Sequence, residues 1–118
     1  MVECCKLPQK QSIRRATTPK QIFTLDLENV SDLTNILITY AQRGIIVVER
    51  TKNSMTIEEN KVWFRLTQEE TLSFRENIPV EIQVRVFTPD GTALASDIFE
   101  VSVGRVLDEE VFENETEG

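Results

Sequence analysis

Adjacent acidic residues are the side chains of this chain whose types could support catalysis: Glu58-Glu59, Glu69-Glu70 and Glu109-Glu110. Two carboxyl groups can act on a glycosidic bond when they lie about 5–10 Å apart and face one substrate. Neighbouring residues on a turn do not face one cleft, so we interpret these pairs as solvated charges. The 118 residues include no histidine, which removes the commonest general base and the usual partner of a nucleophilic serine or cysteine. We therefore predict that the protein is not an enzyme.

Oxygen-bearing side chains also gather around one predicted loop: Asp26, Glu28, Asn29 and Asp32. Carboxylate and amide oxygens are the ligands that Ca²⁺ takes from such loops. Their spacing matches no EF-hand loop, and acidic connections between strands are common. The glycines are isolated and form no phosphate-binding loop. We predict no metal and no cofactor, with calcium at this loop as the alternative.

Two aromatic residues are predicted to face outward. Trp63 lies opposite Val62 and Phe64 in KVWFRL, and Phe87 shares a face with polar residues of the run before it. Outward aromatics can stack on a glycan or cover a neighbouring subunit. The third possibility, that both lie in a core or under a loop, also stays open.

The two cysteines, Cys4 and Cys5, are adjacent, and the chain has no other cysteine. Neighbours along the backbone do not readily reach disulfide geometry, so we predict two free thiols on a loose arm, with an intermolecular bridge or a metal contact as the alternative. No apolar run approaches the roughly 20 residues that span a bilayer. The first residues contain no signal-peptide hydrophobic segment, so we expect synthesis in the cytoplasm and no membrane contact.

Charge is unevenly spread over a chain whose net charge is −7. Basic residues dominate positions 1–20, and acidic residues dominate positions 104–118. Such ends are typical either of arms that meet neighbours of opposite sign or of solubilising, disordered termini. The acidic body disfavours nucleic acid, because it would repel phosphate.

The strongest structural pattern runs from Val80 to Val103. Apolar residues alternate with polar ones from Val80 to Val86, which predicts a strand with one buried face. Thr88-Pro89-Asp90-Gly91-Thr92 then favours a turn. A second apolar run follows, so the sequence predicts a hairpin.

Further strands are predicted at 21–27, 35–42, 45–50, 54–57 and 61–66, with hairpin turns at 42–44 and 58–60. Thr67 and Glu70 match a capping box and predict a short helical turn over 68–73. We predict an all-β fold, an immunoglobulin-like antiparallel β-sandwich of about seven strands with one short helical turn. Its predicted parts are a basic arm (1–19), the sandwich domain (20–104) and an acidic tail (105–118).

Four segments carry a resemblance to a known family: RRATTP (14–19), FRLTQEETLSF (64–74), VEIQVRVFTPDGTALAS (80–96) and SVGRVL (102–107). In this order and spacing they resemble small prophage tail proteins of Firmicutes, which are similar to the N-terminal domain of phage baseplate upper proteins. The resemblance covers about residues 14–112. Ala16 stands where we expect a glycine from that family. The chain ends soon after Phe112, whereas baseplate upper proteins continue into a stalk, so a separate small subunit is expected.

The resemblance implies a non-enzymatic building block of a phage tail or baseplate, located in the virion and present in several copies. Its expected partners are other tail proteins and further copies of itself, and strand addition at a sheet edge is the expected mode of contact. We predict as interface residues Arg14, Arg15, Thr17, Thr18, Pro19, Trp63, Arg85, Phe87, Arg105, Val106 and Leu107. The alternative function is a carbohydrate-binding module for host cell-wall glycan, centred on Trp63.

Overall fold

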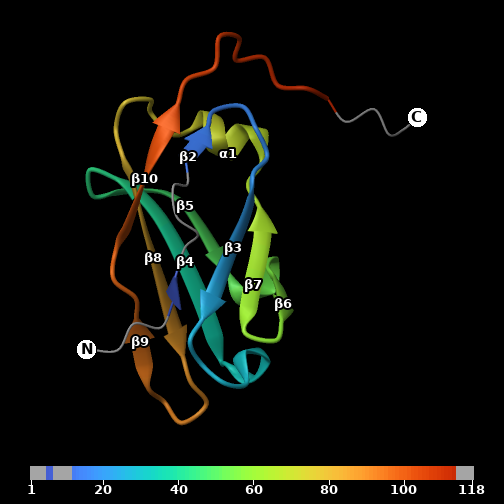
Figure 1. The fold of residues 1–118 in the computed structure, drawn as a ribbon, viewed down its shortest axis with the longest axis vertical. Helices are drawn as coiled ribbons and strands as arrows, with labels where there is room; N and C mark the ends of the chain where they lie inside the picture. Colours follow the sequence, from blue (N-terminus) through green and yellow to red (C-terminus); the bar gives the residue numbers. More distant parts are fainter. Residues whose placement is uncertain (1–4, 7–11, 114–118) are drawn as a thin grey trace.

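Two β-sheets pack face to face in the computed structural model, which describes residues 5–6 and 12–113 (Figure 1). The four-stranded sheet has the order β1 (Cys5–Lys6), β3 (Lys20–Leu25), β7 (Lys61–Arg65), β6 (Thr56–Glu58). The larger sheet has the order β2 (Ser12–Arg14), β10 (Phe99–Gly104), β8 (Val80–Phe87), β4 (Asn35–Gln42), β5 (Ile45–Thr51), and β9 (Ala93–Ala95) also pairs with β8. All pairs are antiparallel except β2 with β10, which is parallel. The predicted antiparallel sandwich is confirmed.

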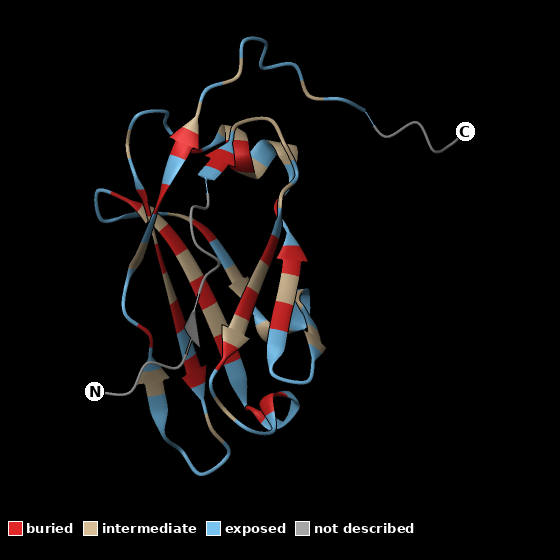
Figure 2. Ribbon diagram, in the orientation of Figure 1, coloured by how far each residue is buried: buried red, intermediate tan, exposed pale blue. Residues whose placement is uncertain are grey.

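Burial follows the alternation that the sequence predicts for β8. Val80, Ile82, Val84 and Val86 are buried between the sheets, and the residues between them point to the outer side (Figure 2). Strand β4 repeats the pattern in the centre of the same sheet. These two strands pair over seven positions in the interior of the larger sheet.

The predicted hairpin after β8 is interrupted. Strand β9 pairs with the end of β8, and β10 pairs with its beginning. Between them Ser96 is buried, its Oγ accepts a hydrogen bond from the Val84 amide at 3.0 Å, and its own amide donates to the Val84 carbonyl. A side chain thus replaces a main-chain ladder bond, and the second run becomes two strands instead of one.

The turn predictions at the other hairpins hold. Arg43 and Gly44 both have positive φ (53° and 81°) between β4 and β5, which is the backbone of a tight two-residue hairpin turn. Helix α1 (Gln68–Leu72) begins with the predicted capping box, in which Thr67 accepts from the Glu70 amide and Glu70 accepts from the Thr67 amide. Two 3₁₀ turns, η1 (Val30–Asp32) and η2 (Lys52–Ser54), complete the elements.

The core joins both sheets through aromatic contacts. The Tyr40 ring lies 6.4 Å from that of Phe64 and 6.0 Å from that of Phe74. The Tyr40 hydroxyl donates a hydrogen bond of 2.7 Å to the buried Gln21 amide oxygen across the sandwich. Burial raises the pKa of Tyr40, and the nearby Arg50 guanidinium opposes this only in part. Tyr40 is a structural residue that links the two layers.

The sequence predicts that residues 1–19 form an arm outside the sandwich, but part of this segment belongs to the sandwich. Ser12–Arg14 form β2 at the edge of the larger sheet, and the Ile13 side chain between them is fully buried. Three residues are too few to show a period, so the sequence pattern does not reveal this strand. The predicted thiols of Cys4 and Cys5 lie outside the side chains that the structure describes. No helix among the described residues is long and apolar enough to cross a membrane.

Candidate functional site

Residues just before the first long strand and residues just after the last strand meet over helix α1. We call this contact the arm–tail clasp, formed by Arg14, Arg15, Gln68 and the tail 105–113. Arg14 Nη1 donates to the Arg105 carbonyl at 2.7 Å, and Arg15 pairs with the Glu109 carboxylate at 2.5 Å. The Gln68 amide group holds the main chain of Phe112 with two hydrogen bonds, of 3.0 and 2.8 Å. The basic arm and the acidic tail, both predicted to dock on neighbours, contact each other within one chain.

Arg15 is the anchor of the clasp. Its Nη2 donates to the Leu72 carbonyl at 3.0 Å, which places the guanidinium over the last turn of α1. The Arg15 side chain is 16% exposed, whereas the Glu109 side chain is 59% exposed. Because a charge pair of this kind is screened on the carboxylate side, the contact with the helix carries more of the stability than the ion pair.

The remaining predicted arm residues connect the clasp to the first long strand. Thr17 and the buried Thr71 of α1 exchange hydrogen bonds of 3.1 and 2.9 Å. The Thr18 carbonyl accepts from the Arg65 guanidinium, and the Pro19 carbonyl accepts from the Leu66 amide. Ala16 adopts φ 64°, the left-handed conformation that glycine takes most readily. All these contacts lie inside the domain.

The outer face of the larger sheet is the second candidate surface. Arg85 and Phe87 of β8 lie on it as predicted, and both are exposed. The sequence prediction missed two apolar neighbours on the same face, Ile46 and Ile98, which are 58% and 55% exposed. Together with residues of β4 and β8, they line a hollow of about 220 Å³. The sequence signal for Ile46 was the pair of isoleucines after Gly44, which breaks the expected alternation.

Trp63 lies on the other sheet. It pairs with Ile22 and Thr56 on the outer side of the four-stranded sheet, where its ring is half-buried and the Lys20 ammonium lies 4.1 Å from the ring centroid. Trp63 and Phe87 therefore belong to different faces and do not form one aromatic platform. Glycan binding at Trp63 stays a prediction, and a Trp63→Ala variant that keeps full glycan affinity would contradict it.

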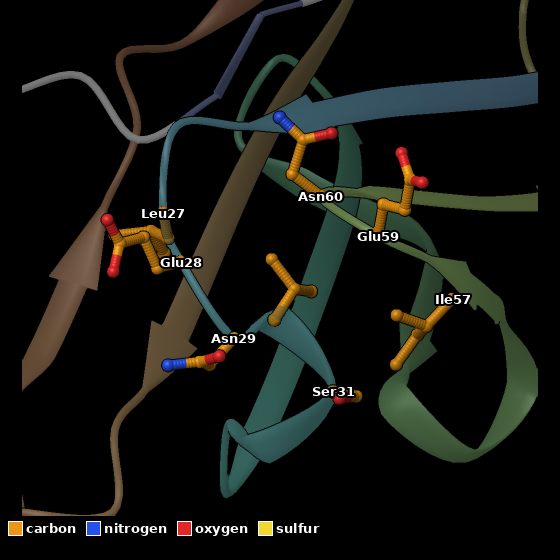
Figure 3. A pocket seen from close by; sticks show the side chains of 8 residues that line it. Leu27, Glu28, Asn29, Ser31, Ile57, Glu59 and Asn60 are labelled. Carbon is orange, nitrogen blue, oxygen red and sulfur yellow. The ribbon is translucent and has the colours of Figure 1, made fainter.

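The loop predicted as an alternative calcium site borders a hollow of about 760 Å³, lined by Leu27, Glu28, Asn29, Val30, Ser31, Ile57, Glu59 and Asn60 (Figure 3). The Glu28 and Glu59 carboxylates point in different directions in this view. Among the described residues, no group of three or more acidic, cysteine or histidine side chains could hold a metal ion. The paired carboxylates, likewise, do not converge: Glu70 binds Arg50 and caps α1, and Glu109 binds Arg15.

Comparison with known proteins identifies the type of fold. No protein-family model matches the sequence, and no curated protein matches it. A chain of the swine CD8aa homodimer superposes with a TM-score of 0.52 at 14% identity, over 86% of this chain and 98% of that one. The fold is immunoglobulin-like. Drosophila OTK, extracellular domains 3–5, is also similar, with a TM-score of 0.40 at 11% identity over 87% of this chain and 37% of that one.

Proposed function

We propose that this immunoglobulin-like domain is a non-enzymatic structural subunit of a bacteriophage or prophage tail or baseplate. The placement in a tail is supported by the family resemblance of residues 14–112. The role as an assembly subunit is supported by the surface chemistry of the larger sheet. No catalytic step is part of the proposal.

The observation that carries the proposal is the exposure of four large apolar side chains on the larger sheet, two of which, Ile46 and Ile98, line one hollow. Ile46, Phe87 and Ile98 are 58%, 42% and 55% exposed on the outer face, and Ile45 is 69% exposed at the start of β5. β5 is also one edge of the larger sheet. Exposed large apolar side chains that line one hollow, as Ile46 and Ile98 do, favour a contact with another protein, and an edge strand favours main-chain pairing with a neighbour. Both features fit a subunit that is covered in an assembly.

Immunogold labelling tests the function. Antibodies against this chain are applied to tail-like particles purified from the induced bacterial strain that encodes it. We expect label at a fixed position along the particle axis. Particles that carry no label, while unassembled chain in the same lysate reacts, would contradict the proposal.

A variant pair connects the function to the outer face. Ile46→Lys with Ile98→Lys should reduce incorporation of this chain into particles at least tenfold, because buried lysines at a subunit contact lose their hydration. The matched control is Thr56→Lys, at an exposed position on the opposite sheet. Equal incorporation of both variants would show that the outer face is not a subunit contact.

A further inference from the structure

A groove lies between the β4–β5 turn and the segment that follows α1. It has a volume of about 410 Å³ and is lined by Gln42, Arg43, Ile45, Val47, Ser73, Arg75 and Ile78. Three of these residues are aliphatic and two are arginines. Arg43 and Arg75 are exposed, and neither has an ion-pair partner within residues 12–113. We call this site the turn groove, and its chemistry suits an acidic segment with apolar side chains.

The walls of the turn groove are held in place from inside. Gln42 is buried, and its Nε2 donates hydrogen bonds of 2.9 Å to the carbonyls of Arg75 and Ile78. Its Oε1 accepts from the Arg75 amide at 2.8 Å. The two sides of the groove are therefore joined through the Gln42 side chain. A ligand that binds there does not lose free energy by ordering the groove.

The chain's own tail has the complementary chemistry. Leu107 and Phe112 are 89% and 77% exposed, although the clasp holds the main chain between them. Four acidic residues lie in the same segment: Asp108, Glu109, Glu110 and Glu113. Clasping by main-chain contacts thus leaves two large apolar side chains and most of the carboxylates turned to solvent.

The tail and the turn groove lie at the same end of the sandwich, but they leave it in different directions. In Figure 1 the tail leaves β10 and runs to the upper right, whereas the β4–β5 turn protrudes on the left. The clasped tail does not occupy the groove of its own chain, because Leu107 and Phe112 are exposed while the main chain at Arg105 and Phe112 is held by Arg14 and Gln68. A tail that binds a turn groove and stays clasped therefore belongs to another copy.

We propose that the clasped tail of one copy binds the turn groove of the next, with Leu107 and Phe112 against Ile45 and Ile78 and the carboxylates near Arg43 and Arg75. The contact is head-to-tail, and repetition of such a contact produces a ring or a filament. This inference rests on the proposed function, because it identifies the contact by which copies of the subunit assemble.

Complementation between two variants of the full chain tests the proposal. The donor variant carries Leu107→Ser and Phe112→Ser, and the acceptor variant carries Ile45→Ser and Arg75→Glu. All four positions are exposed, so we expect both variants to fold. By sedimentation velocity, the unaltered chain should form concentration-dependent oligomers and each variant alone should be monomeric. An equimolar mixture should form dimers and nothing larger, because only one intact tail–groove pair remains.

Three results would overturn the inference. They are an unaltered chain that is monomeric at every concentration, oligomers of either variant alone, and a mixture that stays monomeric. Lys61→Glu, an equal charge reversal at an exposed position of β7 in the four-stranded sheet, is the matched control and should leave the oligomers unchanged. Immunogold labelling is independent of these results: labelled particles combined with failed complementation reject the tail–groove contact and keep the proposed function.

Discussion

The arm–tail clasp and the turn groove lie at the same end of the sandwich, and both contain arginine side chains. They differ in whether the side chains have partners within the chain. In the clasp, arginines and a glutamine meet a carboxylate and main-chain groups of the same chain. At the turn groove, two arginines and three aliphatic side chains have no such partner among the described residues. The opposite charges of the arm and the tail therefore predict that these segments bind a partner of opposite charge. Only the fold shows whether that partner belongs to the same chain.

The largest expected effect tests whether the arm belongs to the domain. Ile13 is fully buried in β2, so Ile13→Ala should lower the free energy of unfolding by about 2–5 kcal/mol. Ile46→Ala, at an exposed position of the outer face, should lower the free energy of unfolding by less than about 0.5 kcal/mol. Urea denaturation followed by tryptophan fluorescence measures both, since the chain has a single tryptophan. Equal effects would mean that the arm is not part of the folded domain.

The next prediction compares the contributions of Arg15 and of its exposed partner Glu109 to stability. Arg15→Ala removes the bond to the Leu72 carbonyl and the contact with Glu109, and it should cost about 1–2 kcal/mol. Glu109→Ala should cost less than about 0.5 kcal/mol, because the carboxylate is mostly exposed. The same denaturation experiment applies. A larger loss for Glu109→Ala than for Arg15→Ala would show that the ion pair, not the helix contact, holds the clasp.

These differences show where sequence reasoning succeeds. The long alternation of β8, the capping box at Thr67 and the turn at Gly44 each depend on neighbours in the chain, so their patterns predict the sandwich and its hairpins. The division of the second run at Ser96 depends on a partner strand, and the burial of Ile13 depends on the parallel pairing of β2 with β10. Contacts between residues far apart in the chain leave no local period.

The candidate site was less predictable than the fold for the same reason. Arg14, Arg15 and Arg105 were predicted as interface residues from charge, yet they contact one another's segments inside the domain. Arg85 and Phe87 were placed on an exposed face by their period of two, and the structure agrees. The turn groove joins two segments about 30 residues apart, and it becomes visible only when Gln42 connects them.

A smaller effect of opposite sign concerns the backbone within the arm. Ala16 has φ 64°, so Ala16→Gly relieves a left-handed strain and should raise the free energy of unfolding by up to about 1 kcal/mol, net of the entropy that glycine gains when unfolded. Gly44 has φ 81°, and an added Cβ would meet no neighbouring atom. Gly44→Ala should therefore lower the free energy of unfolding by about 1 kcal/mol, and backbone strain is the only cause. Thermal unfolding should shift in opposite directions, and a shift of both variants in one direction would contradict the assignment.

The smallest effect lies at the end of the sandwich farthest from the clasp, in the turn between β8 and β9 (Figure 1). Hydrogen bonds from the Thr88 hydroxyl and from Thr92 hold the pKa of the exposed Asp90 carboxyl below its usual value. A folded pKa below the unfolded one stabilises the fold at pH values above the unfolded pKa, and this contribution is lost as pH falls through the folded pKa. Thr88→Val should raise the pKa of Asp90 in an NMR titration, because it removes the hydroxyl that donates to the carboxylate. An unchanged Asp90 titration would show that the hydrogen bond from Thr88 does not hold the pKa of this carboxyl down.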